Sequence, residues 1–207
     1  MGPYRIIVAD PPWRFGDRLP GPKRGAAKHY DVMALPDIEA HLPLLVQARE
    51  VTLTADAVLF MWRVAAMVPE AYRVVEAWGF EAKSEIVWSK QNRSGGRAFG
   101  MGHYVRMAHE ACIIARRVGS RVPHRRALNV RSVFDAGVGR HSAKPDCFFD
   151  LVERLYEGPY LELFARRHRP GWRCLGNELP PAAAEEAPSQ KPALAEGADP
   201  PGDSPRQ

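Results

Sequence analysis

Short apolar runs alternate with amphipathic segments along most of this chain, and the alternation narrows the folds open to it. Residues 4–9 are rich in β-branched side chains and almost continuously apolar, which is typical of a strand buried on both faces. Similar runs occupy residues 57–62, 85–88, 111–115 and 160–164. We therefore predict a sheet whose strands are covered on both sides.

Two amphipathic segments lie between these runs. Gly79 follows the first as a stop signal, and Pro145 and Gly158 flank the second. The two apolar stripes, at helical spacing, are Met67, Ala71, Val74, Val75 and Trp78, then Phe148, Leu151, Val152 and Leu155. Buried strands that alternate with helices predict an α/β fold, and ligands of such sheets bind at the carboxyl ends of the strands.

The composition divides the 207 residues into one domain and a tail. Residues 180–207 hold seven prolines, seven alanines and no aromatic residue, so we expect a disordered acidic tail after a domain of residues 1–179. That domain carries 27 Lys and Arg against 19 Asp and Glu, a net charge of about +8. A basic domain favours an anionic partner, of which nucleic acid is the usual one.

Several classes of protein are disfavoured. The three cysteines are 35 and 27 residues apart, with no clustered histidines, so we expect neither a disulfide framework nor a metal site. No apolar stretch approaches the ~18–20 residues that a membrane span needs, and the chain starts without a leader pattern. We therefore expect a cytoplasmic protein that does not bind membranes.

Three irregular segments, residues 14–29, 91–102 and 116–126, follow the first, third and fourth predicted strands and carry much of the positive charge. They are predicted either to contact phosphates at one shared rim of the sheet or to be solvated surface. The first interpretation makes candidates of Arg14, Lys23, Arg24, Lys28, Arg93, Arg97, Arg116 and Arg117.

The segment Asp10-Pro11-Pro12-Trp13 comes where the first strand ends. The Asp10 carboxylate and the Pro11 carbonyl are two acceptors for the hydrogens of one amino group, while the prolines fix the turn that presents them. Trp13 offers a face against which a planar base can stack. The alternative is a turn whose tryptophan packs into the core.

Strand-Asp-Pro-Pro-Trp resembles the signature of the MT-A70 family of adenine N(6)-methyltransferases. The similarity continues in the family's order through the rest of the domain, over roughly residues 4–179. The further matching segments are 29–33, 59–62, 77–80 with 85–90, 102–104 with 109–110, 142–146, 162–166 and 171–172 with 176–178.

The resemblance implies a Rossmann-like, seven-stranded mixed sheet with helices on both faces and a permuted motif order, in which the catalytic motif precedes the main cofactor strand. It implies S-adenosylmethionine as cofactor. Arg166 and Asn177 are then expected near the ribose hydroxyls, Lys144 near the cofactor's carboxylate and His103 near the target base. The predicted cofactor-binding residues are Asp10, Lys144, Glu162, Leu163, Phe164, Arg166, Asn177 and Glu178, and the predicted catalytic ones are Asp10, Pro11, Pro12 and Trp13.

Three positions depart from the family pattern. Ala165 replaces a frequent glycine and Ala143 a frequent histidine, while Glu178 stands where glutamine is common. A methyl group at residue 165 is compatible with cofactor binding if the backbone there has an ordinary negative φ. Loss of the histidine removes a polar contact, and Glu178 can accept a hydrogen bond but cannot donate one.

The sequence thus predicts an S-adenosylmethionine-dependent transferase that methylates the N(6) amino group of adenine in nucleic acid. We expect DNA rather than RNA, because the chain resembles the minimal bacterial and phage members. Two alternatives stay open: a catalytically silent or partner-dependent nucleic-acid-binding subunit, and a methyltransferase for small molecules or protein amides. The sequence does not distinguish a monomer from a homodimer.

Overall fold

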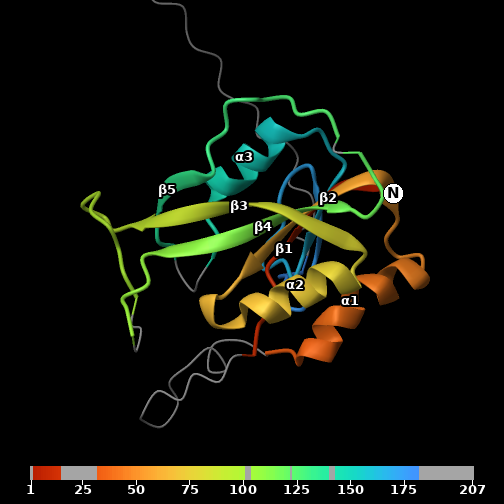
Figure 1. Ribbon diagram of the computed structural model, residues 1–207, viewed down its shortest axis with the longest axis horizontal. Coiled ribbons are helices and arrows are strands. Elements are labelled where there is room, and N and C mark those ends of the chain that lie inside the picture. The colour runs from red at the N-terminus through yellow and green to blue at the C-terminus, as the bar shows by residue number, and fades with distance from the viewer. Residues whose placement is uncertain (1, 15–31, 101–103, 122, 140–142, 182–207) are drawn as a thin grey trace, which may run out of the picture.

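A computed structural model of the protein describes residues 2–14, 32–100, 104–121, 123–139 and 143–181. Its centre is a seven-stranded sheet in the order β5-β3-β4-β2-β1-β6-β7 (Figure 1). The strands are β1 (Tyr4–Ala9), β2 (Leu53–Arg63), β3 (Phe80–Gln91), β4 (His109–Arg117), β5 (Val133–Gly137), β6 (Tyr160–Leu163) and β7 (Trp172–Leu175).

The strands of the sheet do not all run in the same direction, because β4 is antiparallel to its neighbours. It pairs antiparallel with both β2 and β3, whereas the other pairs, β1 with β2, β1 with β6, β3 with β5 and β6 with β7, are parallel. One edge of the sheet therefore gathers the carboxyl ends of six strands and the amino end of β4. We call it the carboxyl edge.

Helices cover both faces of the sheet (Figure 1). On one face, α1 (Leu35–Gln47) and α2 (Val68–Ala77) pack on a core that includes Ile7, Leu59 and Met61. On the other face, α3 (Asp146–Leu155) packs on Ile6 and Phe60. Alternate residues of β1 and β2 thus enter opposite cores, which is why residues 6–9 and 57–62 of these strands are apolar at every position. A short 3-10 helix, η2 (Ala65–Met67), leads into α2.

The α/β fold predicted from the sequence is confirmed, including the seven-stranded mixed sheet. The five apolar runs correspond to β1, β2, β3, β4 and β6, and the two stripes to η2–α2 and α3. Gly79, which ends the first stripe, has a φ of +80° and faces open space. No helix among the described residues is long and apolar enough to cross a membrane.

The basic segments do not all lie at one edge of the sheet. The shared rim predicted for the three basic segments is wrong for residues 116–126, because β4 is antiparallel and its carboxyl end lies at the opposite edge. Arg117 there donates to the carbonyls of Leu53 and Thr54, at the start of β2. The tail of residues 180–207 stays a prediction, because nearly all of it lies outside the described residues.

Candidate active site

Asp10, the first residue after β1, meets a lysine from a distant part of the chain at the carboxyl edge. The Lys144 ammonium donates to Asp10 Oδ2 at 2.7 Å and lies 3.2 Å from Glu110 Oε2. Glu110 comes from the amino end of β4, which the antiparallel direction of that strand brings to this edge. The Lys144 side chain is 10% exposed, and those of Asp10 and Glu110 are 25% and 24% exposed. A shielded cation therefore bridges two carboxylates.

A second lysine completes this group. Lys90, near the end of β3, lies 2.5 Å from Glu110 Oε1. Both ammonium groups also lie over indole rings, Lys144 over Trp62 and Lys90 over Trp88, each 5.2 Å from the ring centroid. The two positive charges thus balance the two negative ones, and an aromatic ring lies beside each ammonium group. We call Asp10, Glu110, Lys90 and Lys144 the charged quartet.

The quartet favours the ionised forms of Glu110 and Lys144. Burial by itself raises the pKa of Glu110, but the charges of Lys144 and Lys90 outweigh it and leave that pKa below its ordinary value. Burial likewise opposes the charge of Lys144, yet Asp10 and Glu110 hold its pKa above the usual range. The arrangement explains why a lysine stands just before α3, where a cation opposes the helix dipole.

The turn after Asp10 is held by backbone hydrogen bonds. The Trp13 N–H donates to the Pro11 carbonyl at 2.8 Å, and the Met33 N–H donates to the Pro12 carbonyl at 3.0 Å. The Pro11 oxygen keeps a second lone pair for another donor. Trp13 is 3% exposed, and its indole N–H donates to the Trp62 carbonyl at 3.0 Å. The structure thus adopts the packed alternative for Trp13, and its contact with a target base stays a prediction.

The predicted cofactor segments lie beside β1, because β1 pairs with β6 and β6 with β7. The two segments that follow β6 and β7 approach so closely that a Cβ on Gly176 would lie 2.2 Å from the Ala165 carbonyl oxygen. Phe164 turns the chain with a φ of +59°, but Ala165 has no positive φ, so its methyl group meets the condition set above. Arg166 Nε lies 3.6 Å from Glu178 Oε2. Residues 164–166 and 176–178 therefore form one continuous ledge.

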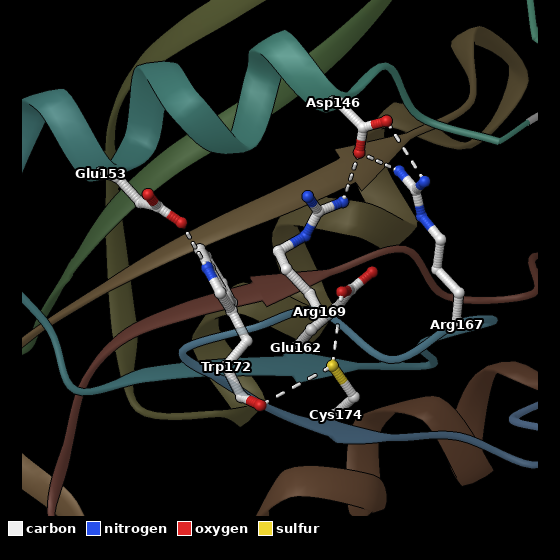
Figure 2. A network of polar contacts seen from close by, with 7 residues as sticks. All are labelled: Asp146, Glu153, Glu162, Arg167, Arg169, Trp172 and Cys174. Atoms are coloured by element: carbon white, nitrogen blue, oxygen red, sulfur yellow. Dashed lines mark hydrogen bonds and ion pairs between the residues drawn. The ribbon is translucent and has the colours of Figure 1, made fainter. Parts of the chain in front are cut away.

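Glu162 is the partly buried acid of this half of the site. Burial raises the pKa of its carboxyl to about 7, an effect that Arg169 opposes and the charge of Asp10 increases. The Cys174 thiol lies 3.9 Å from Glu162 Oε2 (Figure 2). A carboxyl with a pKa near neutrality exchanges its proton readily at physiological pH.

A salt-bridge cluster connects the start of α3 to the loop between β6 and β7. Figure 2 shows Asp146 between Arg167 and Arg169, with Arg169 Nη2 3.0 Å from Asp146 Oδ1. The Arg169 guanidinium also lies over the Phe149 ring, 3.6 Å from its centroid. Because Lys144 is two residues before Asp146, this cluster joins the segment that carries Lys144 to the ledge. We call these residues the Asp146 clamp.

The structure places the predicted nucleic-acid contacts in different regions. Arg14 is exposed next to the turn at the carboxyl edge, and Arg93 and Arg97 are exposed in the segment after β3, at the same edge. Arg116 lies at the opposite edge with Arg117 and pairs with Glu81. The remaining predicted contacts, Lys23, Arg24, Lys28 and His103, lie outside the described residues.

The sequence analysis missed the roles of Glu110 and Lys90. Both were noted only as members of matching segments, but Glu110 directly precedes the apolar run of residues 111–115, and Lys90 follows the run of residues 85–88 by two residues. That signal locates the residues without showing their partners. No group of three His, Cys, Asp or Glu that could hold a metal ion is found in the described part of the chain.

Comparison with known proteins gives a consistent picture. The family model described as MT-A70 matches residues 4–178. The chain is 30% identical over 184 residues to the "N(6)-adenosine-methyltransferase MT-A70-like protein" of Drosophila melanogaster. The matched region covers 86% of this chain and 27% of that protein. It is 29% identical over 196 residues to "Type II methyltransferase M.MunI" of a Mycoplasma species, covering 86% of this chain and 78% of that protein.

Human "N(6)-adenosine-methyltransferase catalytic subunit METTL3" is similar at 29% identity over 184 residues, covering 86% of this chain and 29% of that protein. The chain thus spans only about a quarter of the length of the adenosine methyltransferases. It spans most of the Mycoplasma type II methyltransferase.

Proposed function

The chain belongs to the MT-A70 family, and on that premise we propose that it transfers a methyl group from S-adenosylmethionine to the N(6) amino group of adenine in DNA. The observation that carries the proposal is the position of Asp10. Its carboxylate stands at the carboxyl end of β1, is fixed by Lys144 and lies next to the ledge after β6 and β7. Ligands of α/β sheets bind at this edge.

The residues of the ledge fit the proposed cofactor. S-adenosylmethionine offers ribose hydroxyls as donors, and carboxylates are the strongest acceptors for them. Glu178 supplies such an acceptor, Arg166 and Asn177 supply donors, and the absence of a positive φ at Ala165 is compatible with its methyl group. Glu162 lies beside the ledge, in β6, and its carboxyl is a further polar group for the cofactor. The cofactor supplies an electrophilic methyl group.

The protein's own residues orient and stabilise the amino group of the target. Asp10 Oδ2 accepts from Lys144, which leaves Oδ1 to accept one hydrogen of the adenine amino group. The second lone pair of the Pro11 carbonyl accepts the other hydrogen. Both contacts turn the nitrogen lone pair out of conjugation. The Asp10 charge stabilises the positive charge that develops on nitrogen until one of the two N–H protons is released.

The quartet gives Lys144 a positioning role in this mechanism. Lys144 fixes one oxygen of Asp10 and is itself fixed by Glu110, which Lys90 holds from the other side. A carboxylate restrained in this way loses little freedom when the amino group arrives, so less of the binding energy is spent on ordering the site.

The choice of DNA rather than RNA rests on similarity. The chain is similar to the Mycoplasma type II methyltransferase over 78% of that protein. The resemblance associates the bacterial and phage members of the family with DNA. A target adenine within a duplex has to leave the base stack before it reaches Asp10.

The test is methyl transfer from isotopically labelled S-adenosylmethionine to unmethylated DNA and to RNA of the same sequence, followed by nucleoside digestion. Wild type is compared with Asp10→Asn and with the matched control Asp37→Asn, an exposed acid in the first turn of α1. We expect N(6)-methyladenine in DNA from wild type and the control, and none from Asp10→Asn. Product in RNA alone refutes the choice of DNA, and activity of Asp10→Asn refutes the role of Asp10.

A further inference from the structure

A groove lies at the end of α3 that is distant from Lys144. It encloses about 520 Å³ between the carboxyl end of α3, strands β2 to β4 and the segment that joins β4 to β5. Its lining includes the apolar residues Val58, Ile114 and Tyr156 and the arginines Arg125 and Arg131. The volume is in the range of ligand-binding pockets.

Backbone hydrogen bonds fix the outer wall of the groove at two points. The segment between β4 and β5 crosses the side of the sheet that α3 covers (Figure 1). The Arg126 N–H donates to the Leu155 carbonyl at 2.8 Å, and the Val87 N–H donates to the Ser132 carbonyl at 2.7 Å. Arg125 and Arg131 lie next to these anchor points, and both are exposed.

The groove has an excess of positive charge. Glu81 is shared by Lys83 and Arg116, and Glu85 accepts hydrogen bonds from Nε and Nη2 of Arg63. The acids that border the groove are therefore occupied. Arg125 and Arg131 form no ion pair within the described part of the chain.

We propose that this groove binds the phosphodiester backbone of the nucleic-acid substrate at a distance from the target adenine. The inference rests on the proposed function, since it assigns a second contact to the same substrate. Unpaired, exposed arginines present forked donors that match phosphate oxygens, and the Ser84 and Ser132 hydroxyls that line the groove can donate to the same group.

The length of α3 gives the expected spacing. Lys144 precedes this helix of 10 residues and the groove adjoins its last residue, so roughly 15 Å of helix separates the two places at 1.5 Å per residue. At about 3.4 Å per nucleotide along a strand, this corresponds to roughly four or five nucleotides. A substrate with fewer flanking nucleotides cannot occupy both places at once.

The test compares wild type with the double variant Arg125→Gln/Arg131→Gln on two DNA duplexes. One carries two base pairs on each side of the target adenine and is closed at both ends by polyethylene-glycol linkers that keep it annealed, and the other carries twelve. We expect wild type to have a higher kcat/KM on the long duplex, on the order of tenfold for two phosphate contacts, and the variant to lose this advantage. Both proteins should act equally on the short duplex. Equal preference for the long duplex in both proteins overturns the inference.

A measurement of DNA binding without methyl transfer distinguishes failure of the groove proposal from failure of the proposed function. The dependence of the DNA dissociation constant on salt, measured by fluorescence anisotropy with the long duplex, should be shallower in the variant by a slope of about 1.8. The control is Arg49→Gln/Arg73→Gln, which removes two exposed charges from the region of α1 and α2. An unchanged slope in the groove variant, or an equal loss in the control, refutes the groove. Absence of methylation by wild type refutes only the proposed function.

Discussion

Replacing Glu162 by glutamine should stabilise the protein without bound cofactor at pH 8 and leave its stability nearly unchanged at pH 4.5. In the folded protein, burial raises the pKa of Glu162 to about 7, against a usual value of 4.5. Between these two pH values the folded state holds a proton that the unfolded state has released. The contribution of Glu162 to the free energy of unfolding is therefore fully present below pH 4.5 and is lost as pH rises toward 7.

The size of the effect follows from the shift. At 1.36 kcal/mol per pKa unit, a rise from 4.5 to about 7 corresponds to about 3 kcal/mol of stability lost above pH 7. Glutamine has the shape of the protonated acid and does not titrate in this range. The difference in the free energy of unfolding, variant minus wild type, should grow from near zero at pH 4.5 to about 3 kcal/mol at pH 8.

The assay is urea denaturation followed by circular dichroism at pH 4.5, 6, 7 and 8, with both proteins free of cofactor. Other groups titrate in the same range, but their contributions cancel in the difference between the two proteins. Glu50→Gln, at an exposed site after α1, is the matched control and should differ from wild type by less than about 0.5 kcal/mol throughout. A Glu162→Gln difference that is constant across this pH range would refute the reasoning.

Further predictions concern the quartet, the clamp and the core. Lys144→Met leaves two carboxylates without their shared cation, so it should lower the free energy of unfolding by about 3 kcal/mol or more in urea, and wild-type stability would contradict the shared role. Asp146→Asn weakens the contacts of Arg167 and Arg169, so calorimetry should show weaker binding of S-adenosylmethionine with little change in melting temperature; unchanged affinity would limit the clamp to a structural role. Trp13→Phe removes the donor to the Trp62 carbonyl and should cost about 1–3 kcal/mol in the same urea assay, whereas an unaffected variant would show that this bond adds nothing.

The local sequence was sufficient to predict most of the framework. Strands β1, β2 and β4 are buried on both faces and therefore carry continuous apolar runs, and the stripes of α2 and α3 follow helical periodicity. Helix α1 and strands β5 and β7 were not among the predicted elements. The two strands have five and four residues, and their burial is partial, so they carry no comparable apolar run.

Some residues of the candidate site could be predicted from the local sequence, and others could be located only in the structure. Asp10 was predicted because its signal is local: a carboxylate at the end of a buried strand, followed by two prolines and a tryptophan. The partners of Asp10 could not be predicted by such reasoning, because Lys144 is 134 residues away and Glu110 reaches the edge only through the direction of β4. For the same reason the basic segment after β4 was predicted at the wrong edge.

The sequence by itself determined which segments form β1, β2, β3, β4 and β6 and the helices α2 and α3, because burial and periodicity are properties of neighbouring residues. It also determined the acid, the prolines and the tryptophan of the candidate site. Only the tertiary structure decided that Trp13 is packed, that Lys144 lies between Asp10 and Glu110, and that Arg125 borders a groove beyond α3. These features depend on strand direction and on contacts between distant segments, which pairing across the sheet establishes and local residue patterns do not encode.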